Sequence, residues 1–385
     1  MGIAYMLLPI YGFMAEDYPV LRGPWGWREV PTQAPYQQGV VAPGYEMAAV
    51  AAAELLQQHR AVLHAPALSA AVVIDGDLIW SAATGWSDLA EQRAATPQTL
   101  FRIGSTSKPI TGTLLARFID AGLLDLDTPI SAYVTDLPNP QWAAITLRQL
   151  ASHSSGLPDY ETNRDWLGVY QSMALRRHHT DIREGLANFD GAPLRHDPGT
   201  WFEYSSYGTN LLAVVLQEVG GKPFQRLIQD WLRTPLGIET PLPDADIPAR
   251  ATFYQLDGSM ARRWREVDLS NKLPGGGFMS RPEDLAVLGA AWLDDRFISA
   301  ETRNEFWTPQ RLADGTVNEQ AYALTWRWSE RSNMANHGGV SKGSKAWLAV
   351  YPAQRMVIAL TMNTNVNEFS DFAAVQYALK EVFER

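Results

Sequence analysis

The 385-residue sequence contains no cysteine. Disulfide bonds, thiolate catalysis and zinc sites with cysteine ligands are therefore excluded. The cellular compartment stays open, because secreted proteins can also lack cysteine. The seven histidines include no His-Glu-x-x-His pair, and the neighbours His178 and His179 stand in a strongly charged stretch that is typical of a solvated surface. We therefore expect no metal site.

An excess of basic residues is also absent. The chain carries 32 lysines and arginines against 42 aspartates and glutamates, which gives a formal net charge of −10 at pH 7. Nucleic acids bind proteins mainly through phosphate contacts to basic side chains, so this balance argues against a nucleic-acid partner. With 46% hydrophobic and 19% charged residues, the composition is that of an ordinary globular protein.

The apolar segment at the N-terminus is too short to cross a membrane readily. Residues 2–15 (GIAYMLLPIYGFMA) are apolar and uncharged, but they are too few, and no small-x-small cleavage site follows them. This segment is either the remainder of a signal or membrane anchor, which we favour, or an extended arm packed on the protein. The first reading predicts membrane association outside the cytoplasm, while a cytoplasmic location stays open. Residues 16–44, rich in Pro, Gly, Trp and Tyr, predict an extended segment.

Strand signals lie near both ends of the chain. Residues 69–75 and 77–84 alternate around an Asp-Gly turn and predict a hairpin, and residues 346–351 and 356–361 predict a second hairpin. Between and beside them, helical periodicity predicts helices, with Gly220-Gly221 ending the third. These expected helices cover residues 45–63, 145–151, 210–219 and 372–383.

This distribution predicts an α/β fold of the α+β type. We expect an antiparallel sheet that is flanked by helices and built from both termini, with a helical domain inserted into it. In this division, residues 1–44 form an N-terminal segment and residues 45–385 the main domain. Its α/β part spans about 45–98 and 275–385, and its helical part about 99–274. A cleft between two such parts is a natural place for a site.

Ser105 and Lys108 form the one Ser-x-x-Lys pair in the chain. At the opening turn of a helix, residues three apart leave the same face and can touch. A serine hydroxyl becomes a useful nucleophile when a neighbouring base accepts its proton, and the free N–H groups of a first helical turn suit the negative charge that develops. Alone this motif is weak, but further pieces follow downstream.

The second piece is the stretch FEYSSYG at 202–208, after the turn signal Asp-Pro-Gly. A tyrosine beside a lysine and a serine can pass protons between them, and Tyr204 is our candidate for this role. The third piece is NHGGV at 336–340, expected immediately before a strand. Gly338 and Gly339 would let a substrate lie close to the backbone, the N–H of Val340 would face its carbonyl oxygen, and His337 would add a donor at the mouth of the site.

The order Ser105-x-x-Lys108, Tyr204-Ser205-Ser206 and His337-Gly338-Gly339 resembles the penicillin-binding, class C β-lactamase-like family of serine hydrolases. The segments LASHSSGLP at 150–158 and GGGFMSRPEDL at 275–285 also resemble that family, over a likeness that runs from about residue 45 to the C-terminus. Within the family, FRI at 101–103, YSSYG at 204–208 and FWTP at 306–309 resemble the serine β-lactamase-like group with a mitochondrial member.

The resemblance implies roles for these residues. Ser105 would form the acyl-enzyme, Lys108 and Tyr204 would manage its proton, and the N–H groups of Ser105 and Val340 would form the oxyanion hole. Two departures matter. The usual Tyr-Ser-Asn ends here in Ser206, so a hydroxyl replaces an amide that holds the substrate. The usual Lys-Thr-Gly begins here with His337, which weakens the fixed positive charge for a β-lactam carboxylate.

The sequence therefore predicts a serine hydrolase that cleaves an amide or ester without a metal or organic cofactor. Small peptides, including those with D-residues, are the first expected substrates and carboxylic esters the second. Two alternatives stay open. One is a penicillin-binding protein that acylates but deacylates slowly, and the other is a self-assembling or ligand-binding protein with little turnover. A homo-oligomer is compatible with each of these readings.

Overall fold

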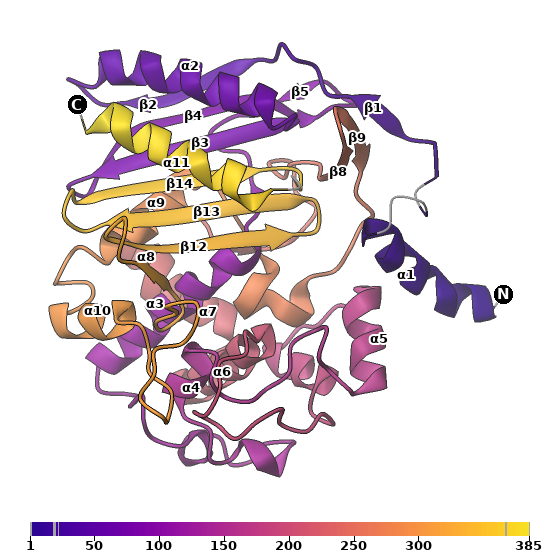
Figure 1. The fold of residues 1–385 in the computed structure, drawn as a ribbon, viewed down its shortest axis with the longest axis vertical. Coiled ribbons are helices and arrows are strands. Elements are labelled where there is room, and N and C mark those ends of the chain that lie inside the picture. The colour runs from indigo at the N-terminus through magenta and orange to yellow at the C-terminus, as the bar shows by residue number, and fades with distance from the viewer. Residues whose placement is uncertain (1, 18–20, 22, 366–367, 385) are drawn as a thin grey trace.

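A computed structural model describes residues 2–17, 21, 23–365 and 368–384. An antiparallel sheet dominates it (Figure 1). From one edge to the other, this sheet contains β11 (Arg327–Ser329), β12 (Met334–Ser341), β13 (Ser344–Tyr351), β14 (Met356–Met362), β3 (Ala67–Ile74), β4 (Asp77–Asp88) and β2 (Tyr36–Val41), and β5 (Arg93–Ala94) pairs with β4. Two three-stranded sheets have the orders β1 (Trp27–Glu29), β9 (Met260–Arg263), β8 (Tyr254–Asp257) and β6 (Phe101–Arg102), β10 (Phe278–Ser280), β7 (Leu242–Pro243).

The two predicted hairpins are confirmed, and they meet in the middle of the sheet. β3 and β4 turn at Asp75 and Gly76, whose φ angles of 53° and 90° are the left-handed values of a two-residue hairpin turn. β13 and β14 form the C-terminal hairpin, and β14 pairs antiparallel with β3. Nearly every residue of β3 and β14 is buried, as expected for central strands covered on both faces. The predicted fold, an antiparallel sheet built from both ends of the chain, is thereby confirmed.

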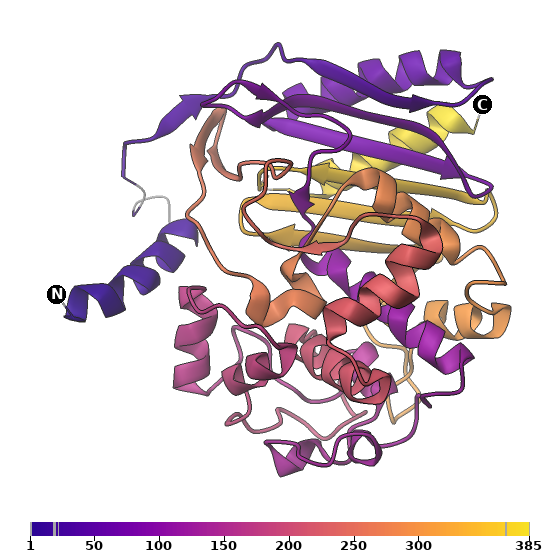
Figure 2. The same ribbon diagram turned by 180° about the vertical axis from the view of Figure 1, so that it is seen from behind.

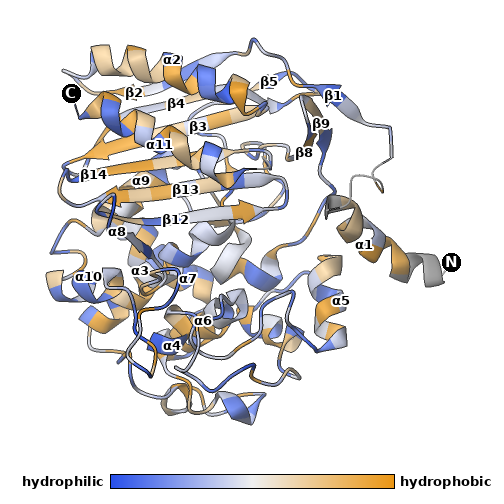
Figure 3. Ribbon diagram, in the orientation of Figure 1, coloured by the Kyte–Doolittle hydropathy of each residue, from blue (hydrophilic) through white to orange (hydrophobic). Residues whose placement is uncertain are grey.

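Helices cover both faces of this sheet (Figures 1 and 2). α2 (Glu46–Val62) and α11 (Phe369–Phe383) pack on one face and bury an apolar layer against β3, β4 and β14. α9 (Pro282–Ala291) packs on the other face, where the apolar core continues into the helical part of the chain. Figure 3 shows this layering as apolar strands between helices with mixed surfaces. The helix predicted at residues 45–63 is confirmed as α2 and the one at 372–383 as α11.

The helical part lies between the strands in sequence and beside the sheet in space (Figure 2). Its helices are α3 (Ser107–Asp120), α4 (Leu147–Ala151), α5 (Trp166–Ala174), α6 (Ser206–Gly220), α7 (Phe224–Ile228) and α8 (Thr234–Leu236). A further helix, α10 (Ala300–Trp307), follows α9 in the sequence. Short 3-10 or π turns occupy Gly104–Thr106, Ile130–Ala132, Pro140–Trp142, Ile182–Asn188, Gln229–Arg233, Ser270–Lys272 and Leu273–Gly277. α3 runs under the sheet and contributes Ile110, Leu114, Leu115 and Phe118 to the shared core.

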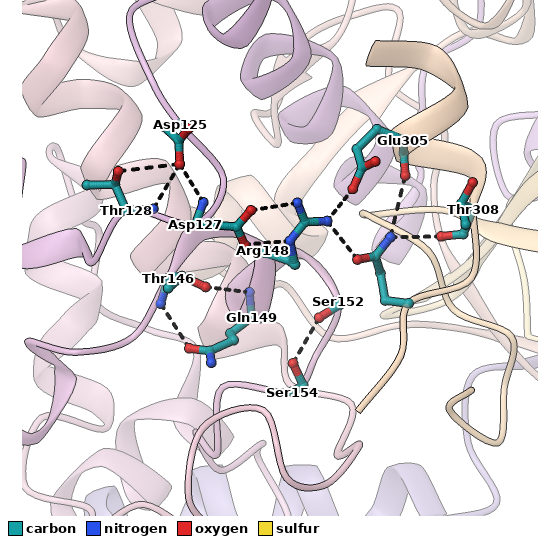
Figure 4. A network of polar contacts seen from close by, with 11 residues as sticks. Asp125, Asp127, Thr128, Thr146, Arg148, Gln149, Ser152, Ser154, Glu305 and Thr308 are labelled. Atoms are coloured by element: carbon teal, nitrogen blue, oxygen red, sulfur yellow. Dashed lines mark hydrogen bonds and ion pairs between the residues drawn. The ribbon is translucent and has the colours of Figure 1, made fainter. Parts of the chain in front are cut away.

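A polar network around Arg148 fixes α4 (Figure 4). The guanidinium forms two hydrogen bonds to Asp127, at 2.6 and 2.8 Å, pairs with Glu305 of α10, and donates to Gln310 Oε1 at 2.9 Å. The hydrogen bonds to Asp127 are the largest influence on Arg148 and raise its pKa. A capping box of Thr146 and Gln149 closes the N-terminus of the same helix. α4, which leads into residues 152–158, is therefore fixed by Asp127 on one side and by Glu305 of α10 on the other.

The N-terminal residues differ from the prediction in two respects. Gly2–Asp17 form a helix, α1, with Pro9 inside it, which contradicts the alternative of an extended arm but not the favoured one of a signal or anchor remnant, and α1 lies beside α5. Tyr36–Val41, which the sequence placed in an extended segment, form the edge strand β2 of the main sheet. Among the described residues, none of the helices combines the length and hydropathy that a bilayer crossing requires.

Candidate active site

Ser105 lies in a 3-10 turn that joins the short strand β6 to α3. The turn spans Gly104–Thr106, so the serine stands immediately before the helix rather than within its first turn. Gly104 has a φ of +52°, and a Cβ there would lie 2.4 Å from the carbonyl oxygen of Val340. Only glycine fits this close approach, which packs the turn directly against β12. The Ser105 side chain remains half-buried.

Lys108 is fully buried on the first turn of α3, and its amine points back at Ser105. Its Nζ donates to Ser105 Oγ at 3.2 Å, to Ser206 Oγ at 3.2 Å and to the carbonyl oxygen of Gly275 at 2.9 Å. In its protonated form the amine offers three donors to these three acceptors, whereas the neutral amine offers two and has a lone pair that can accept the proton of Ser105. The amine is therefore fixed in position beside the hydroxyl that a base would have to deprotonate.

Tyr204 lies against Lys108 from the segment that precedes α6. Its ring centroid lies 4.7 Å from Lys108 Nζ, and the side chain is half-buried. The residue directly precedes Ser205, whose hydroxyl caps α6 by accepting from the N–H of Gly208 at 3.2 Å. α6 begins at Ser206, four residues before the predicted start, and ends as predicted at Gly220-Gly221. The stretch 204–206 is thus a helix N-terminus aimed at Lys108.

The Ser206 hydroxyl contacts Lys108 directly. The Ser206 backbone contacts Asp159, a residue that the sequence analysis did not single out. The N–H of Ser206 donates to Asp159 Oδ1 at 3.1 Å. Burial raises the pKa of the Asp159 carboxyl, while the positive charge of Lys108 opposes this rise. The sequence also assigned no role to Gly275, although it noted the glycine triplet that supplies this carbonyl. No local sequence pattern could predict the contact of Ser206 with Asp159 or that of Lys108 with Gly275, because the partners are 47 and 167 residues apart in the chain.

The stretch 336–340 requires a correction, because it lies inside strand β12 rather than before a strand. Its glycines do not open space for a substrate. A Cβ on Gly339 would lie 1.9 Å from the carbonyl oxygen of Ile103, and one on Gly338 would lie 2.4 Å from the ring of Phe369. Gly339 therefore lets the Ser105 turn dock on the strand, while Gly338 makes room for a ring that belongs to α11.

His337 is also not where the sequence placed it. It is completely buried rather than exposed at the mouth of a site. Its Nε2 lies 3.0 Å from the hydroxyl of Tyr322 and 3.3 Å from Nη1 of Arg327, and its Nδ1 lies 2.8 Å from the carbonyl oxygen of Gly338. Burial, followed by the charges of Arg327 and Lys108, lowers the pKa of His337 well below its usual value. The imidazole is therefore neutral, and it links β12 to Tyr322 and Arg327 inside the protein.

Val340 faces the Ser105 turn with its backbone, and its side chain is 52% exposed. Its partner on β13 is Lys345, while β11 pairs only with residues 334–336 of β12. The backbone of Val340 thus lies at the open end of the strand, next to Ser105.

His153 packs against the rings of Tyr204 and Tyr322. Its Nδ1 accepts a hydrogen bond from the N–H of Ser205 at 3.2 Å, and its ring centroid lies 4.2 Å from that of Tyr204 and 4.5 Å from that of Tyr322. Burial lowers the pKa of His153 well below its usual value, and the charges of Lys108 and Arg327 add to this. His153 is neutral and joins the chain after α4 to the start of α6.

The structure brings Ser105, Lys108, Tyr204, Ser206 and the backbone of Val340 together. It leaves His337, Gly338 and Gly339 in structural positions on β12, as described above. Within the described residues, no group of three or more His, Asp or Glu side chains could hold a metal ion.

Comparisons with known proteins place this geometry in a family. The profile described as "Beta-lactamase" matches residues 52–382. The human serine beta-lactamase-like protein LACTB, mitochondrial, is 25% identical over an alignment length of 391, and the alignment covers 78% of this chain and 71% of that protein. The D-amino acid amidase from Ochrobactrum anthropi, solved with L-phenylalanine, has a TM-score of 0.71 at 22% identity, covering 86% of this chain and 99% of that one.

A third comparison concerns assembly. The octameric penicillin-binding protein homologue from Pyrococcus abyssi has a TM-score of 0.69 at 21% identity, covering 87% of this chain and 77% of that one. Homo-oligomers therefore occur on this fold. The likeness to both solved structures, at these identities, is one of fold, whereas the family profile covers most of the chain. The chain belongs to the beta-lactamase family and is, as its sequence predicts, a serine hydrolase.

Proposed function

We propose that this hydrolase cleaves small amides and esters through an acyl-enzyme on Ser105. Aminoacyl amides and small peptides, including those with D-residues, are the first substrate class, and carboxylic esters are the second. The distance of 3.2 Å between Lys108 Nζ and Ser105 Oγ carries the proposal, because it joins a nucleophile to a base in hydrogen-bonding contact.

In the acylation step, a neutral Lys108 amine takes the hydroxyl proton of Ser105 while Oγ bonds to the substrate carbonyl carbon. The carbonyl electron pair moves onto its oxygen, which accepts hydrogen bonds from the N–H groups of Ser105 and Val340. When the pair returns, the bond to the leaving amine or alcohol breaks. Tyr204 passes the proton from Lys108 to that leaving group, and the acyl group remains on Ser105.

Deacylation repeats these transfers with water as the nucleophile. The water gives a proton to Lys108 through Tyr204 and bonds to the acyl carbon. Collapse then breaks the ester to Ser105 Oγ, which regains its proton from Lys108 and releases a carboxylic acid. Ser206 and the carbonyl of Gly275 keep the amine oriented during both steps, since they bind it at 3.2 and 2.9 Å.

β-Lactams are expected to be poor substrates of this site. Ser206 is engaged with Lys108 and provides no amide for the substrate, and the neutral, buried His337 supplies no charge where the family's usual motif has lysine. Acyl transfer itself needs neither that amide nor that charge. The expected order of turnover is therefore D-aminoacyl p-nitroanilides and p-nitrophenyl esters well above nitrocefin.

Screening these three probes side by side, followed by intact-protein mass spectrometry, tests the proposal. We expect measurable hydrolysis of an ester or anilide, and a transient adduct that maps to Ser105. A lasting β-lactam adduct with no turnover of any probe would instead identify a slowly deacylating penicillin-binding protein. A chain that neither turns over nor is labelled by any probe would contradict acyl transfer altogether.

We also propose that α1 binds a membrane surface, as the sequence favoured for residues 2–15. Leu7, Leu8 and Tyr11 are 55%, 55% and 52% exposed on this helix, and such side chains can enter the headgroup region of a bilayer. Replacing Leu7 and Leu8 by glutamate removes two apolar anchors worth about 1.5–3 kcal/mol each. We expect at least about tenfold less protein to cosediment with anionic phospholipid vesicles. Equal cosedimentation of both forms would contradict the proposal.

A further inference from the structure

α5 begins with two large apolar side chains that face solvent. Trp166 is 86% exposed and Leu167 is 65% exposed. Asp165 caps the helix by accepting hydrogen bonds from the N–H groups of Leu167 and Gly168, both at 3.1 Å. A Cβ on Gly168 would lie 1.8 Å from the carbonyl oxygen of Asn188, so this residue marks the side of α5 that packs on the protein. Trp166 and Leu167 are therefore held in solvent by a capped and closely packed helical turn.

Arg265 joins α5 to α1. Its guanidinium donates to the carbonyl oxygens of Met173 and Ala174, at 3.1 and 3.2 Å, at the end of α5. A Cβ on Gly12 of α1 would lie 3.3 Å from Cδ of Arg265, so the same side chain also lies against α1. The two helices lie side by side (Figure 1), and their exposed apolar residues belong to one region of the molecule, the α1–α5 surface. This surface contains Leu7, Leu8, Tyr11, Trp166 and Leu167.

Arginines border α5 at both ends. Arg164 precedes the helix, Arg176 and Arg177 follow it, and all three are exposed. Arg177 pairs with Glu184 at 3.2 Å, in a surface pair of the kind that contributes little energy. Exposed Trp and Leu side chains beside arginines are typical of surfaces that bind anionic lipids, because the apolar groups enter the headgroup region while the arginines meet the phosphates. The charges at the ends of α5 thus complement an anionic bilayer.

The two helices adjoin both walls of the active site. On one wall, the ring centroid of Phe13 of α1 lies 4.8 Å from Nζ of Lys342, in the turn that follows β12. On the other wall, Asp159 accepts from the N–H of Ser206 at 3.1 Å and lies shortly before α5 in the sequence. Ser105 lies between these walls. A bilayer that contacts the α1–α5 surface therefore lies next to the site.

We infer that the α1–α5 surface docks on an anionic phospholipid bilayer, with Trp166 and Leu167 in the headgroup region, and that the site takes its substrates from this bilayer. The inference rests on the proposed function, both for acyl transfer at Ser105 and for the binding of α1. It adds a second contact, and two contacts fix the orientation of the protein, whereas α1 alone would let it turn. The substrate class is amides and esters that carry a long apolar chain, since such molecules reside in a bilayer rather than in water.

The absence of cysteine permits a direct test of insertion. Leu167→Cys supplies a single thiol for the fluorophore NBD, whose emission rises and shifts to shorter wavelength when it leaves water. We expect this change with vesicles of phosphatidylcholine and phosphatidylglycerol, and a smaller change at 1 M salt, where the Debye length is about 3 Å. Val50→Cys with the same label is the control, because Val50 is 63% exposed on α2, which packs on the main sheet. Unchanged emission at position 167, or an equal change at both positions, would overturn the inference.

A pair of esters tests the source of the substrate, namely p-nitrophenyl palmitate in these vesicles and p-nitrophenyl butyrate in solution. Trp166→Ser/Leu167→Ser removes two apolar anchors and should lower the ratio of the palmitate rate to the butyrate rate about tenfold or more. Met47→Ser/Val50→Ser should keep the ratio, because it changes two exposed apolar residues on α2 instead. Damage to the fold would slow both esters alike. An unchanged ratio in the variant of α5 would show that the substrate does not come from the bilayer, and would overturn that part of the inference.

The labelling experiment separates the inference from the proposed function, because it requires neither turnover nor Ser105. If neither ester is hydrolysed while the label at position 167 enters the vesicles, acyl transfer fails and the docking surface stands. If Leu7→Glu/Leu8→Glu abolishes cosedimentation while the label at position 167 stays in water, α1 binds alone and the inference is overturned. A Trp166→Ser/Leu167→Ser protein that binds vesicles as before but dissociates from an oligomer into monomers would assign the surface to a second copy of the chain, which also overturns it.

Discussion

Replacing Ser105 by alanine is expected to abolish turnover while leaving the fold intact. The substitution removes the atom that forms the acyl-enzyme, and in serine hydrolases loss of one member of the catalytic unit costs about 10⁴–10⁶-fold in kcat. The hydroxyl is half-buried in a turn whose geometry depends on Gly104, and Lys108 keeps two of its three acceptors. We therefore expect a change in kcat of at least about 10³-fold and an unfolding temperature close to that of the unmodified protein.

The measurement uses the best substrate of the probe screen together with labelling by a fluorophosphonate. Ser152→Ala is the control, because Ser152 is a buried serine whose hydroxyl contacts Ser154, 3.0 Å away, rather than the site. The control should keep both turnover and label. A Ser105→Ala protein that retains turnover, or a label that maps to another serine, would reject Ser105 as the nucleophile. Loss of turnover with loss of the folded state would say nothing of catalysis, so thermal unfolding is measured on the same samples.

The sequence predicted those parts of the fold that depend on local patterns. The Asp75-Gly76 hairpin followed from turn chemistry, because these residues adopt left-handed φ angles readily. α2 and α11 followed from apolar periodicity. Edge strand β2 was missed because its residues are mostly exposed and include a glycine, so they show no alternation. α1 was missed because Pro9 and Gly12 disfavour a helix on propensity alone.

The candidate site divides in the same way. Ser105 and Lys108 are three residues apart, so one turn of chain sets their contact, and the motif was sufficient to find them. The carbonyl of Gly275 reaches Lys108 across 167 residues, which no local pattern encodes. His337 was misplaced because the sequence does not say which face of β12 a residue presents.

Lys108→Met is expected to lower kcat/KM nearly as far as loss of Ser105. The methionine keeps the length of the side chain but cannot accept a proton, and residues that act as one catalytic unit give similar losses when removed singly. We expect a decrease of at least about 10³-fold for ester and anilide alike. The burial of Lys108 adds a second consequence. Removing its amine leaves the carbonyl of Gly275 and the hydroxyl of Ser206 without their donor, which should cost about 1–3 kcal/mol of the free energy of unfolding.

A double-mutant cycle separates these two effects. If Lys108 acts through Ser105, the double variant Ser105→Ala/Lys108→Met should turn over no more slowly than Ser105→Ala alone, because the second change removes a base that has nothing left to activate. The loss of stability should still appear in full in the double variant, since it arises from Gly275 and Ser206. Lys222→Met is the control, because Lys222 pairs with Asp230 on the surface at 2.8 Å. A Lys108→Met protein that is destabilised but keeps its kcat/KM would reduce Lys108 to a structural amine, and the proton of Ser105 would then need another acceptor.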